Sequence, residues 1–340
     1  MTDACELGVV IGRFQPFHYG HLALLQHALS LAPRALVIIG SARGPRMAKN
    51  PFTVEERSAA ILASLPADQQ ARVSFAGVRD YYDEPRWAGA VKAAVAKETH
   101  GSVALVGFRK DASSSYLSLF PEWQDVSLPR QAPIDGTALR RLYFSTPTGD
   151  LPAALVQAVP PAVAELLRTF RDSPHYALLR DELLSLDENA REYGPGPFIT
   201  VDALVTRAEH VLLIQRGRPP GKGLWGLPGG FLDGSERLLS AAMRELRAET
   251  ELGCTDAELR SALRDSAVFD HPQRSQRGRT ITHAYHFALP GDASALPKVT
   301  GADDAQAARW LPIAAISDMP EQLFEDHFQI IDHFLKISRD

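Results

Sequence analysis

One stretch of sequence decides the fold of the first part of the chain, and it reads Gly12-Arg13-Phe14-Gln15-Pro16-Phe17-His18-Tyr19-Gly20-His21. It follows an apolar run at residues 7–11 that predicts a buried strand, and a helical pattern over residues 21–31 comes after it. The stretch is therefore the turn between a strand and a helix.

The residue types in this turn favour binding of an anion. Gly12 allows a ligand to approach the backbone closely, and a helix that begins near Gly20 offers unpaired N–H groups. His18 and His21 are three residues apart at the helix start, so both side chains can face the same oxygen atoms. The spacing indicates a phosphate-binding loop; the alternative is an ordinary turn with two incidental histidines.

The first 145 residues or so repeat this alternation of strand and helix. Thr53 and Glu56 have the spacing of a capping box and mark one helix start. Alternating strands and helices predict an α/β domain with a Rossmann-like parallel sheet, whose ligands bind beyond the carboxyl ends of the strands. Further strands are expected at residues 36–40, 73–76 and 103–107, and further helices at residues 53–65 and 87–97.

The character of the sequence changes after residue 150. Residues 151–170 form a helical pattern broken by Pro160 and Pro161, and the sequence GPGP at 194–197 is a breaker cluster. From Phe198 on, two apolar runs joined by a short polar turn predict a hairpin. One helix and further strands follow, and a terminal helix is expected near residues 320–336. We expect three parts: a domain at residues 1–150, a helical linker at 151–197 and a mixed α/β/α sandwich at 198–340.

Composition excludes several classes of protein. The 340 residues are 45% hydrophobic and 23% charged, as in ordinary globular proteins, and no apolar run is long enough to span a membrane. The net charge of −5 disfavours a nucleic-acid binder. Cys5 and Cys254 are far apart and have no metal-binding spacing, and the first ten residues do not read as a secretory signal. A cytoplasmic protein with reduced cysteines is expected.

A second motif joins the histidine pair. His18-Tyr19-Gly20-His21 resembles the (H/T)xGH motif of nucleotidylyltransferases, and Ile134-Asp135-Gly136-Thr137-Ala138-Leu139-Arg140 resembles their ISxTxxR motif. The match holds at Ile134, Thr137 and Arg140, but Asp135 replaces the usual serine, and we expect no phosphate contact from it.

Other segments narrow the resemblance. Gly40-Ser41-Ala42 followed by the segment NPFTVEER at residues 50–57, and Asp80 with Trp87, are similar to archaeal-type nicotinamide mononucleotide (NMN) adenylyltransferases. The resemblance implies that Trp87 stacks on the nicotinamide ring; alternatively it is a core aromatic residue. The segment GFRKD at 107–111, with Tyr116 and FPEW at 120–123, looks like the bacterial subgroup that is fused to a Nudix domain.

The resemblance also implies a chemistry for the first domain. The NMN phosphate attacks the α-phosphorus of ATP, which gives NAD and pyrophosphate and needs no protein nucleophile. His18 and His21 would contact the ATP phosphates, and Arg140 would neutralise the leaving pyrophosphate. Nicotinate mononucleotide is an alternative acceptor. The other residues expected to bind ATP or NMN are Gly12, Arg13, Phe14, Gly20, Arg57, Trp87, Gly107 and Thr137.

A carboxylate-bearing helix dominates the last part of the chain. We expect Ser235 to cap it, and Glu245 and Glu249 are four residues apart, so their Cβ atoms lie on one face about 5 to 6 Å apart. Two carboxylates held in this way bind hard divalent cations, which bridge a diphosphate and activate water. Such cations also supply positive charge to the acidic half of the chain.

The sequence LWGLPGGFL at 224–232, with Glu236 and the segment RELRAE at 244–249, resembles the Nudix box, Gx5Ex7REUxEExGU. The resemblance to ADP-ribose pyrophosphatases implies that Gly229, Glu245 and Glu249 bind Mg²⁺, with Mn²⁺ as a possible substitute. Two positions depart from the box: Ala248 stands where a glutamate is usual, and Glu251 where a glycine is usual.

Arginines follow in the segment FDHPQRSQRGRTITH at 269–283, which resembles the same fused subgroup. Arg274, Arg277 and Arg279 are expected to clamp a phosphate of ADP-ribose; alternatively they belong to a solvated turn. His283 and His286 project to opposite faces of a strand, which argues against a shared metal ion.

Together these features predict a bifunctional NAD-metabolism enzyme. Its first domain makes NAD from NMN and ATP, and its last domain hydrolyses ADP-ribose to AMP and ribose 5-phosphate. The alternative is a Nudix domain that senses ADP-ribose or NAD without hydrolysing it.

Overall fold

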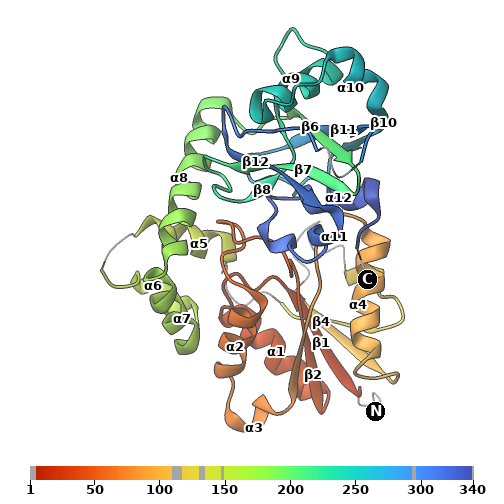
Figure 1. Ribbon diagram of the computed structural model, residues 1–340. Helices are drawn as coiled ribbons and strands as arrows, with labels where there is room; N and C mark the ends of the chain where they lie inside the picture. The colour runs from red at the N-terminus through yellow and green to blue at the C-terminus, as the bar shows by residue number, and fades with distance from the viewer. Residues whose placement is uncertain (1–4, 109–116, 130–134, 147–148, 293–295, 339–340) are drawn as a thin grey trace. The chain divides into compact units, whose positions relative to one another are not determined.

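The computed structural model describes residues 5–108, 117–129, 135–146, 149–292 and 296–338 (Figure 1). The chain divides into two compact units, unit 1 up to Arg180 and unit 2 from Asp181 onward. Within the described ranges, none of the helices combines the length and the apolar composition that crossing a bilayer requires.

Unit 1 contains a parallel sheet. Its described strands are β1 (Leu7–Gly12), β2 (Arg34–Ile39), β3 (Val73–Gly77), β4 (Val103–Gly107) and β5 (Gln124–Ser127). They are ordered β3-β2-β1-β4-β5, and every neighbouring pair is parallel. The predicted Rossmann-like architecture is confirmed. Strand order reverses at β1, so the loops that follow β1 and β4 border the crevice where open α/β sheets bind ligands.

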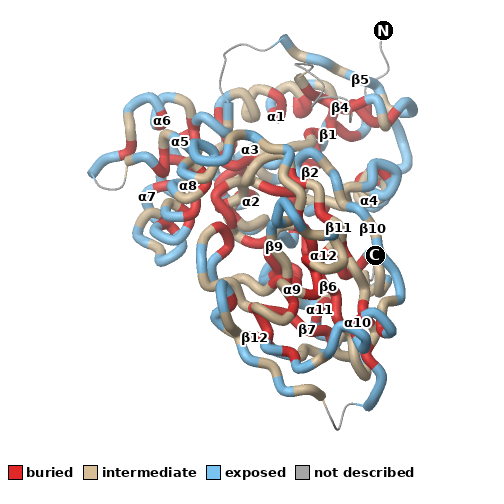
Figure 2. The backbone as a smooth tube through the Cα atoms, turned by 90° about the horizontal axis from the view of Figure 1, so that it is seen from above, coloured by how far each residue is buried: buried red, intermediate tan, exposed pale blue. Residues whose placement is uncertain are grey.

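Helices cover both faces of this sheet. They are α1 (Tyr19–Leu31), α2 (Val54–Ala63), α3 (Ala67–Gln70) and α4 (Glu84–Ala96). Leu7 and Val9 of β1 share one core with Val91 of α4. Gly8 points the other way, toward α1, where a Cβ atom would come within 2.9 Å of Ala28. Because alternate residues of β1 are buried on opposite sides, the strand reads as a continuous apolar run (Figure 2).

Four helices follow the sheet: α5 (Gly136–Ser145), α6 (Ala153–Ala158), α7 (Pro161–Arg171) and α8 (Pro174–Tyr193). The predicted break at Pro160 and Pro161 separates α6 from α7. The segment 151–197, expected as a helical linker, consists largely of helix, and α8 is continuous across the division between the units.

Unit 2 contains a mixed sheet. Its strands are β6 (Phe198–Arg207), β7 (His210–Arg216), β8 (Trp225–Gly226), β9 (Gly229–Phe231), β10 (Leu263–Phe269), β11 (Thr280–Ala288) and β12 (Ala305–Pro312). The order is β10-β11-β6-β7-β12, with β8 paired to β7 and β9 to β6. The predicted hairpin is confirmed: β6 and β7 are antiparallel, and Ala208 and Glu209 turn between them with φ of 45° and 61°.

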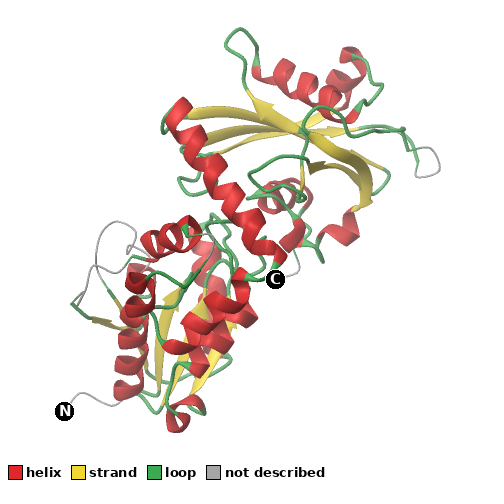
Figure 3. Ribbon diagram, turned by 90° about the vertical axis from the view of Figure 1, so that its left-hand side faces the viewer, coloured by secondary structure: helices red, strands yellow, loops and turns green. Residues whose placement is uncertain are grey.

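Helices lie on both faces of this sheet as well (Figure 3). They are α9 (Leu238–Thr250), α10 (Asp256–Ala262), α11 (Ile313–Ile316) and α12 (His327–Leu335), with a short 3-10 turn at Pro320–Gln322. Ala203 and Val205 of β6 pack with α9 and α10, whereas Leu204 between them packs with α11 and α12. This is the predicted α/β/α sandwich.

The predicted single helix over residues 320–336 is wrong. A non-helical segment separates the 3-10 turn from α12, because Leu323 and Phe324 are buried in the core and the Phe324 N–H donates to the Trp225 carbonyl. This segment also supplies Glu325 and Asp326, which matter below.

Candidate active sites

In unit 1, the histidine pair lies at the N-terminus of α1. His18 is the N-cap residue, and its Nδ1 accepts a hydrogen bond from the His21 backbone N–H at 3.4 Å. The two imidazole rings are stacked, with centroids 3.6 Å apart. Gly20 permits this arrangement, since a Cβ atom there would lie 3.0 Å from the His18 ring. Both rings therefore lie at a helix end that favours negative charge.

Arg140 comes to the same loop from α5. Its Nη1 donates to the Gln15 carbonyl at 2.5 Å, across 125 residues of sequence, and its Nη2 donates to the Thr137 hydroxyl at 3.1 Å. Burial, followed by the positive charge of Arg13, lowers the pKa of Arg140 to about 10. Arg140 remains charged at neutral pH, so two guanidinium groups of like charge lie near one loop and favour an anionic ligand.

Asp135, which departs from the family motif, is the N-cap residue of α5. Its carboxylate accepts a hydrogen bond from the Thr137 N–H at 3.1 Å. Aspartate caps helices as well as serine does, so the substitution preserves the helix start. Ile134, the first residue of that motif, lies outside the described residues, as do Arg109, Lys110, Asp111 and Tyr116.

Arg57, which is expected to bind ATP or NMN, lies buried behind the loops of the site. Arg57 is 2% exposed, and its guanidinium donates to backbone carbonyls of the loops around the site. Nη1 donates to the Arg13 and Gly40 carbonyls, both at 2.8 Å, and Nε donates to the Thr53 carbonyl at 3.0 Å. Most of its donors are used within the protein, so Arg57 holds the loops around the site, and its contact with ATP or NMN stays a prediction.

Phe14 also supports the loop rather than lining it. Its side chain is 2% exposed and its ring centroid lies 5.0 Å from that of His21, with the ring planes nearly perpendicular. A Cβ atom on Gly12 would approach the Phe14 ring to 2.9 Å, which explains the glycine. Gly107 ends β4 beside β1, and the next residue, Phe108, has its ring 3.8 Å from the Cβ position of Gly20.

Trp87 lies on α4, partly buried. Its ring centroid is 6.0 Å from that of Phe120, and it packs against the core of unit 1. Asp80, predicted to accompany it, accepts a hydrogen bond from the Ser41 hydroxyl at 2.6 Å, which ties two loops together. Stacking of Trp87 on a nicotinamide ring stays a prediction.

In unit 2, the two predicted carboxylates flank one turn. Glu249 is 4% exposed, and its Oε2 accepts a hydrogen bond from the Gly229 N–H at 2.8 Å. A Cβ atom on Gly230 would lie 2.4 Å from Glu245 Oε1, so a larger residue there would displace the Glu245 carboxylate. Arg244 bridges Glu236 and Glu245 with contacts of 2.7 Å and 2.9 Å, which fixes the orientation of Glu245.

The chemistry of these groups fits a divalent cation. Burial raises the pKa of Glu249 to about 8, and the charges of Glu245 and Asp202 add to the effect. Burial also raises the pKa of Glu245. A cation would relieve this repulsion, and carboxylate and carbonyl oxygens are the ligands that Mg²⁺ prefers. Among the described side chains, no group of three or more His, Cys, Asp and Glu residues has metal-binding geometry. The candidate set is therefore the two carboxylates and the Gly229 carbonyl.

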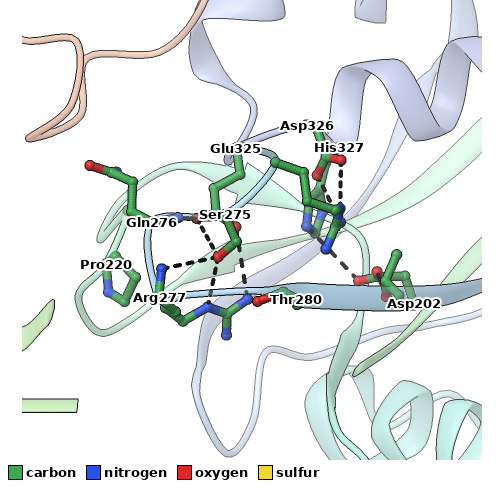
Figure 4. Close-up of polar contacts among 12 residues, drawn as sticks. Asp202, Pro220, Ser275, Gln276, Arg277, Thr280, Glu325, Asp326 and His327 are labelled. Atoms are coloured by element: carbon green, nitrogen blue, oxygen red, sulfur yellow. Dashed lines mark hydrogen bonds and ion pairs between the residues drawn. The ribbon is translucent and has the colours of Figure 1, made fainter. Parts of the chain in front are cut away.

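Two buried residues behind this turn were missed by the sequence analysis. His327 Nδ1 accepts a hydrogen bond from the Leu227 N–H at 2.8 Å, so its proton is on Nε2, which lies 3.9 Å from Asp202 Oδ1 (Figure 4). Burial lowers the pKa of His327 to about 4. Asp202 also accepts a hydrogen bond from Thr282. The sequence contained one indication of this pair: Asp202 is a charged residue among the apolar residues of the predicted strand that begins at Phe198.

The three predicted arginines have different surroundings. The side chain of Arg274 is 3% exposed and forms a two-pronged ion pair with Asp326, with both contacts at 2.8 Å. Two of its nitrogens are thus already paired with a carboxylate, and a phosphate contact by Arg274 stays a prediction. Arg279 is partly exposed and binds the carbonyl of Asp270. Arg277 lies 5.1 Å from the ring of Phe231, which directly follows the glycine turn.

The helix that bears the carboxylates begins and ends differently from expectation. Ser235 does not cap α9; Arg237 is the N-cap residue and makes no side-chain capping bond. The reason is that Gly234 and Ser235 belong to a turn two residues earlier. At the other end, Glu251 has φ of 52°, the left-handed conformation for which the family motif uses glycine.

Comparison with known proteins decides the family. The family profile described as cytidylyltransferase-like matches residues 9–141, and the NUDIX domain profile matches residues 196–334. The crystal structure of a bifunctional NMN adenylyltransferase/ADP ribose pyrophosphatase from Francisella tularensis is 34% identical, with a TM-score of 0.90 over 98% of this chain and 99% of the other. The chain belongs to this bifunctional family.

Other members and relatives agree. A second structure from Francisella tularensis, complexed with AMP and a manganese ion, has the same identity, coverage and TM-score. The nicotinamide/nicotinic acid mononucleotide adenylyltransferase of Acinetobacter baylyi is 38% identical over 53% of this chain and 95% of its own length. The ADP-ribose pyrophosphatase of Methanocaldococcus jannaschii is 29% identical over 41% of this chain and 74% of its own length.

Proposed function

We propose that this protein is a bifunctional enzyme of NAD metabolism. Its first activity, assigned to residues 1–150, transfers the adenylyl group of ATP to NMN and releases pyrophosphate. Its second, assigned to residues 198–340, hydrolyses ADP-ribose to AMP and ribose 5-phosphate. Residues 151–197 are the helical connection. Family membership and both sets of site residues support the assignment.

The observation that best supports the first activity is the contact of Arg140 with the loop at residues 12–21, which carries Arg13 and the histidine pair. An oxygen of the NMN phosphate attacks the α-phosphorus of ATP, and the bond to the β-phosphate oxygen breaks. His18 and His21 hold the ATP phosphates in line. Arg13 and Arg140 stabilise the charge that develops on the leaving pyrophosphate. Thr137 orients Arg140.

The first activity is tested by NAD formation from NMN and ATP. Arg140→Lys keeps the charge but loses the planar fork, so kcat/KM should fall by about 100-fold or more. The matched control is Arg141→Lys, the exposed neighbour on α5, which should remain within about twofold of wild type. Equal rates for the two variants would refute the assignment of Arg140. Replacing NMN by nicotinate mononucleotide in the same assay measures the acceptor preference.

The second activity depends on the Gly229–Gly230 turn. Glu245, Glu249 and the Gly229 carbonyl would hold Mg²⁺ or Mn²⁺, which supplies positive charge to the diphosphate and lowers the pKa of bound water. Glu249 also fixes the Gly229 backbone by accepting its N–H, and Arg244 holds Glu245 in place. Hydrolysis breaks one P–O bond of the diphosphate and adds the oxygen of water to phosphorus.

The decisive assay measures AMP release from ADP-ribose with Mg²⁺ or Mn²⁺, and Glu249→Gln is the control. We expect AMP release in wild type and its loss in the variant. Binding of ADP-ribose without AMP release would refute the hydrolase and favour the sensor. In that case the double change Ala248→Glu, Glu251→Gly should restore hydrolysis, because it restores the acidic pattern of the Nudix box.

A further inference from the structure

Arg216, the last residue of β7, lies against the aromatic ring of Phe324, in the segment that precedes α12. Its guanidinium carbon is 4.2 Å from the ring centroid of Phe324, and its Nε donates to the Pro220 carbonyl at 2.8 Å. The guanidinium of Arg277 lies 5.8 Å from the centroid of the same ring. Two cations from distant parts of the sequence thus lie at one phenylalanine.

Two like charges at one ring favour binding of an anionic ligand. Burial lowers the pKa of Arg216, and the charge of Arg277 lowers it further, while Glu325 and Glu249 act in the opposite direction. Glu325 lies 3.8 Å from Arg277 Nη2, but its Oε1 already accepts hydrogen bonds from Ser275 and Gln276, both at 2.9 Å. Arg277 also lies 5.1 Å from the ring centroid of Phe231, which directly follows the Gly229–Gly230 turn.

Buried carboxylates hold the two arginines in place. Glu325 binds the loop that carries Arg277, as Figure 4 shows. Glu182 of α8 is 3% exposed and binds both loops: its Oε2 accepts from the Gly221 N–H at 3.0 Å, and its Oε1 accepts from Gln276 Nε2 at 3.1 Å. Neither arginine loop is therefore held by local turns alone.

We propose that Arg216 and Arg277 form a clamp that binds a phosphate group of ADP-ribose. The inference rests on the proposed ADP-ribose hydrolysis and adds to it a residue, Arg216, that the sequence analysis did not identify. The carboxylates of α9 would hold a cation, and the two guanidinium groups bind phosphate oxygens directly. Guanidinium forks match the geometry of phosphate oxygens and are well suited to this role.

The alternative is that Arg216 only closes the loop from Gly217 to Leu224, through its bond to the Pro220 carbonyl. The two interpretations differ in their consequences. If Arg216 only closes the loop, its substitution should lower the melting temperature of the protein in proportion to the loss of phosphate affinity. If Arg216 belongs to a clamp, its substitution should weaken phosphate binding in a protein that remains folded.

The test is binding of the non-hydrolysable probe α,β-methylene ADP-ribose in the presence of Mn²⁺, measured by calorimetry on the full chain. Arg216→Gln should raise Kd by about 10- to 100-fold, and Arg216→Lys should raise it less. The matched control is Arg218→Gln: Arg218 is two residues away, 72% exposed and paired with Asp304. It should bind the probe within about threefold of wild type.

Two further measurements make the test decisive. Mn²⁺ affinity without nucleotide, followed by electron paramagnetic resonance, should be unchanged or tighter in Arg216→Gln, because a positive charge near Glu249 is removed. Melting curves of Arg216→Lys should show a folded protein. Equal probe affinity in Arg216→Gln and Arg218→Gln would overturn the clamp, as would a binding loss that follows the melting temperature.

Failure of the clamp and failure of the proposed function are distinguishable. If wild type releases AMP from ADP-ribose and binds the probe but Arg216→Gln binds it equally well, only the clamp fails. If wild type neither releases AMP nor binds the probe, the proposed hydrolase fails and the clamp with it.

Discussion

Replacing Arg57 by methionine should destabilise unit 1 strongly while leaving direct ATP contacts intact. Arg57 is 2% exposed and donates to the carbonyls of Arg13, Gly40 and Thr53 at 2.8 to 3.0 Å. Each hydrogen bond from a charged group contributes about 1.5 to 3 kcal/mol, and removal of the buried cation recovers part of its desolvation cost. We expect the free energy of unfolding of unit 1 to fall by about 3 to 5 kcal/mol.

A second arginine provides the control. Arg72 also donates to backbone carbonyls, those of Leu29, Ala32 and Pro33, but at the opposite end of the strands from the site. Urea unfolding and the kinetics of NAD formation would be measured for Arg57→Met and Arg72→Met. Both should lose stability, but only Arg57→Met should also lower kcat, because only its partners shape the phosphate loop.

The result that would refute this reasoning is specific. The refuting result is a free energy of unfolding for Arg57→Met within about 1 kcal/mol of wild type, together with a KM for ATP that rises tenfold or more. The guanidinium would then bind the substrate, as the sequence predicts. Loss of a phosphate contact thus changes the KM for ATP, whereas loss of a loop-holding contact changes the free energy of unfolding.

Three further predictions concern unit 2. Glu251→Gly should raise the free energy of unfolding by about 0.5 to 1 kcal/mol, because relief of strain at φ of 52° exceeds the added chain entropy of glycine; a lower urea midpoint would contradict this. Burial lowers the pKa of His327 to about 4, so between pH 6.5 and 4 the unfolded chain binds more protons than the native one. The free energy of unfolding therefore decreases as the pH is lowered through this range. Relative to His327→Gln, wild type should lose about 2 to 3 kcal/mol between pH 7.5 and 4.5, and parallel pH profiles would rule the effect out. Glu182→Gln should raise the KM for ADP-ribose and lower the melting temperature, since one accepting oxygen becomes a donor that faces another donor; an unchanged KM would show that the loops do not depend on Glu182.

Much of the fold could be predicted because its determinants are local. Apolar runs of five or six residues marked β1, β2 and β4, and the Thr53–Glu56 capping box marked the start of α2. The segment after Pro320 was mispredicted as continuous helix because its side chains are as apolar as a helix face. What breaks it is a hydrogen bond to Trp225, which a local pattern does not contain.

The sites were predicted as far as their residues lie within one element. Glu245 and Glu249 share a helix face, and His18 and His21 share a helix start, so their spacing alone indicated proximity. Asp202 and His327 were missed because they meet across 125 positions of sequence, and neither lies in a motif. The strand pairing and the placement of α12 bring them together behind the glycine turn.

The arginines show where prediction from the sequence fails for a physical reason. A guanidinium serves equally well for a phosphate, a carboxylate or several carbonyl groups, and the choice depends on which partner the fold brings within 3 Å. Arg57 donates to carbonyl groups and Arg274 pairs with Asp326. Arg140, in contrast, contacts the loop at which a phosphate is expected to bind. Arg216 could not be predicted as a site residue because its strand contains no motif, yet the fold brings it and Arg277 to the same phenylalanine ring. An arginine that binds a ligand is therefore expected to keep guanidinium N–H donors without protein partners and to lie near a second positive charge. An anionic ligand then accepts from those donors and reduces the repulsion between the two charges.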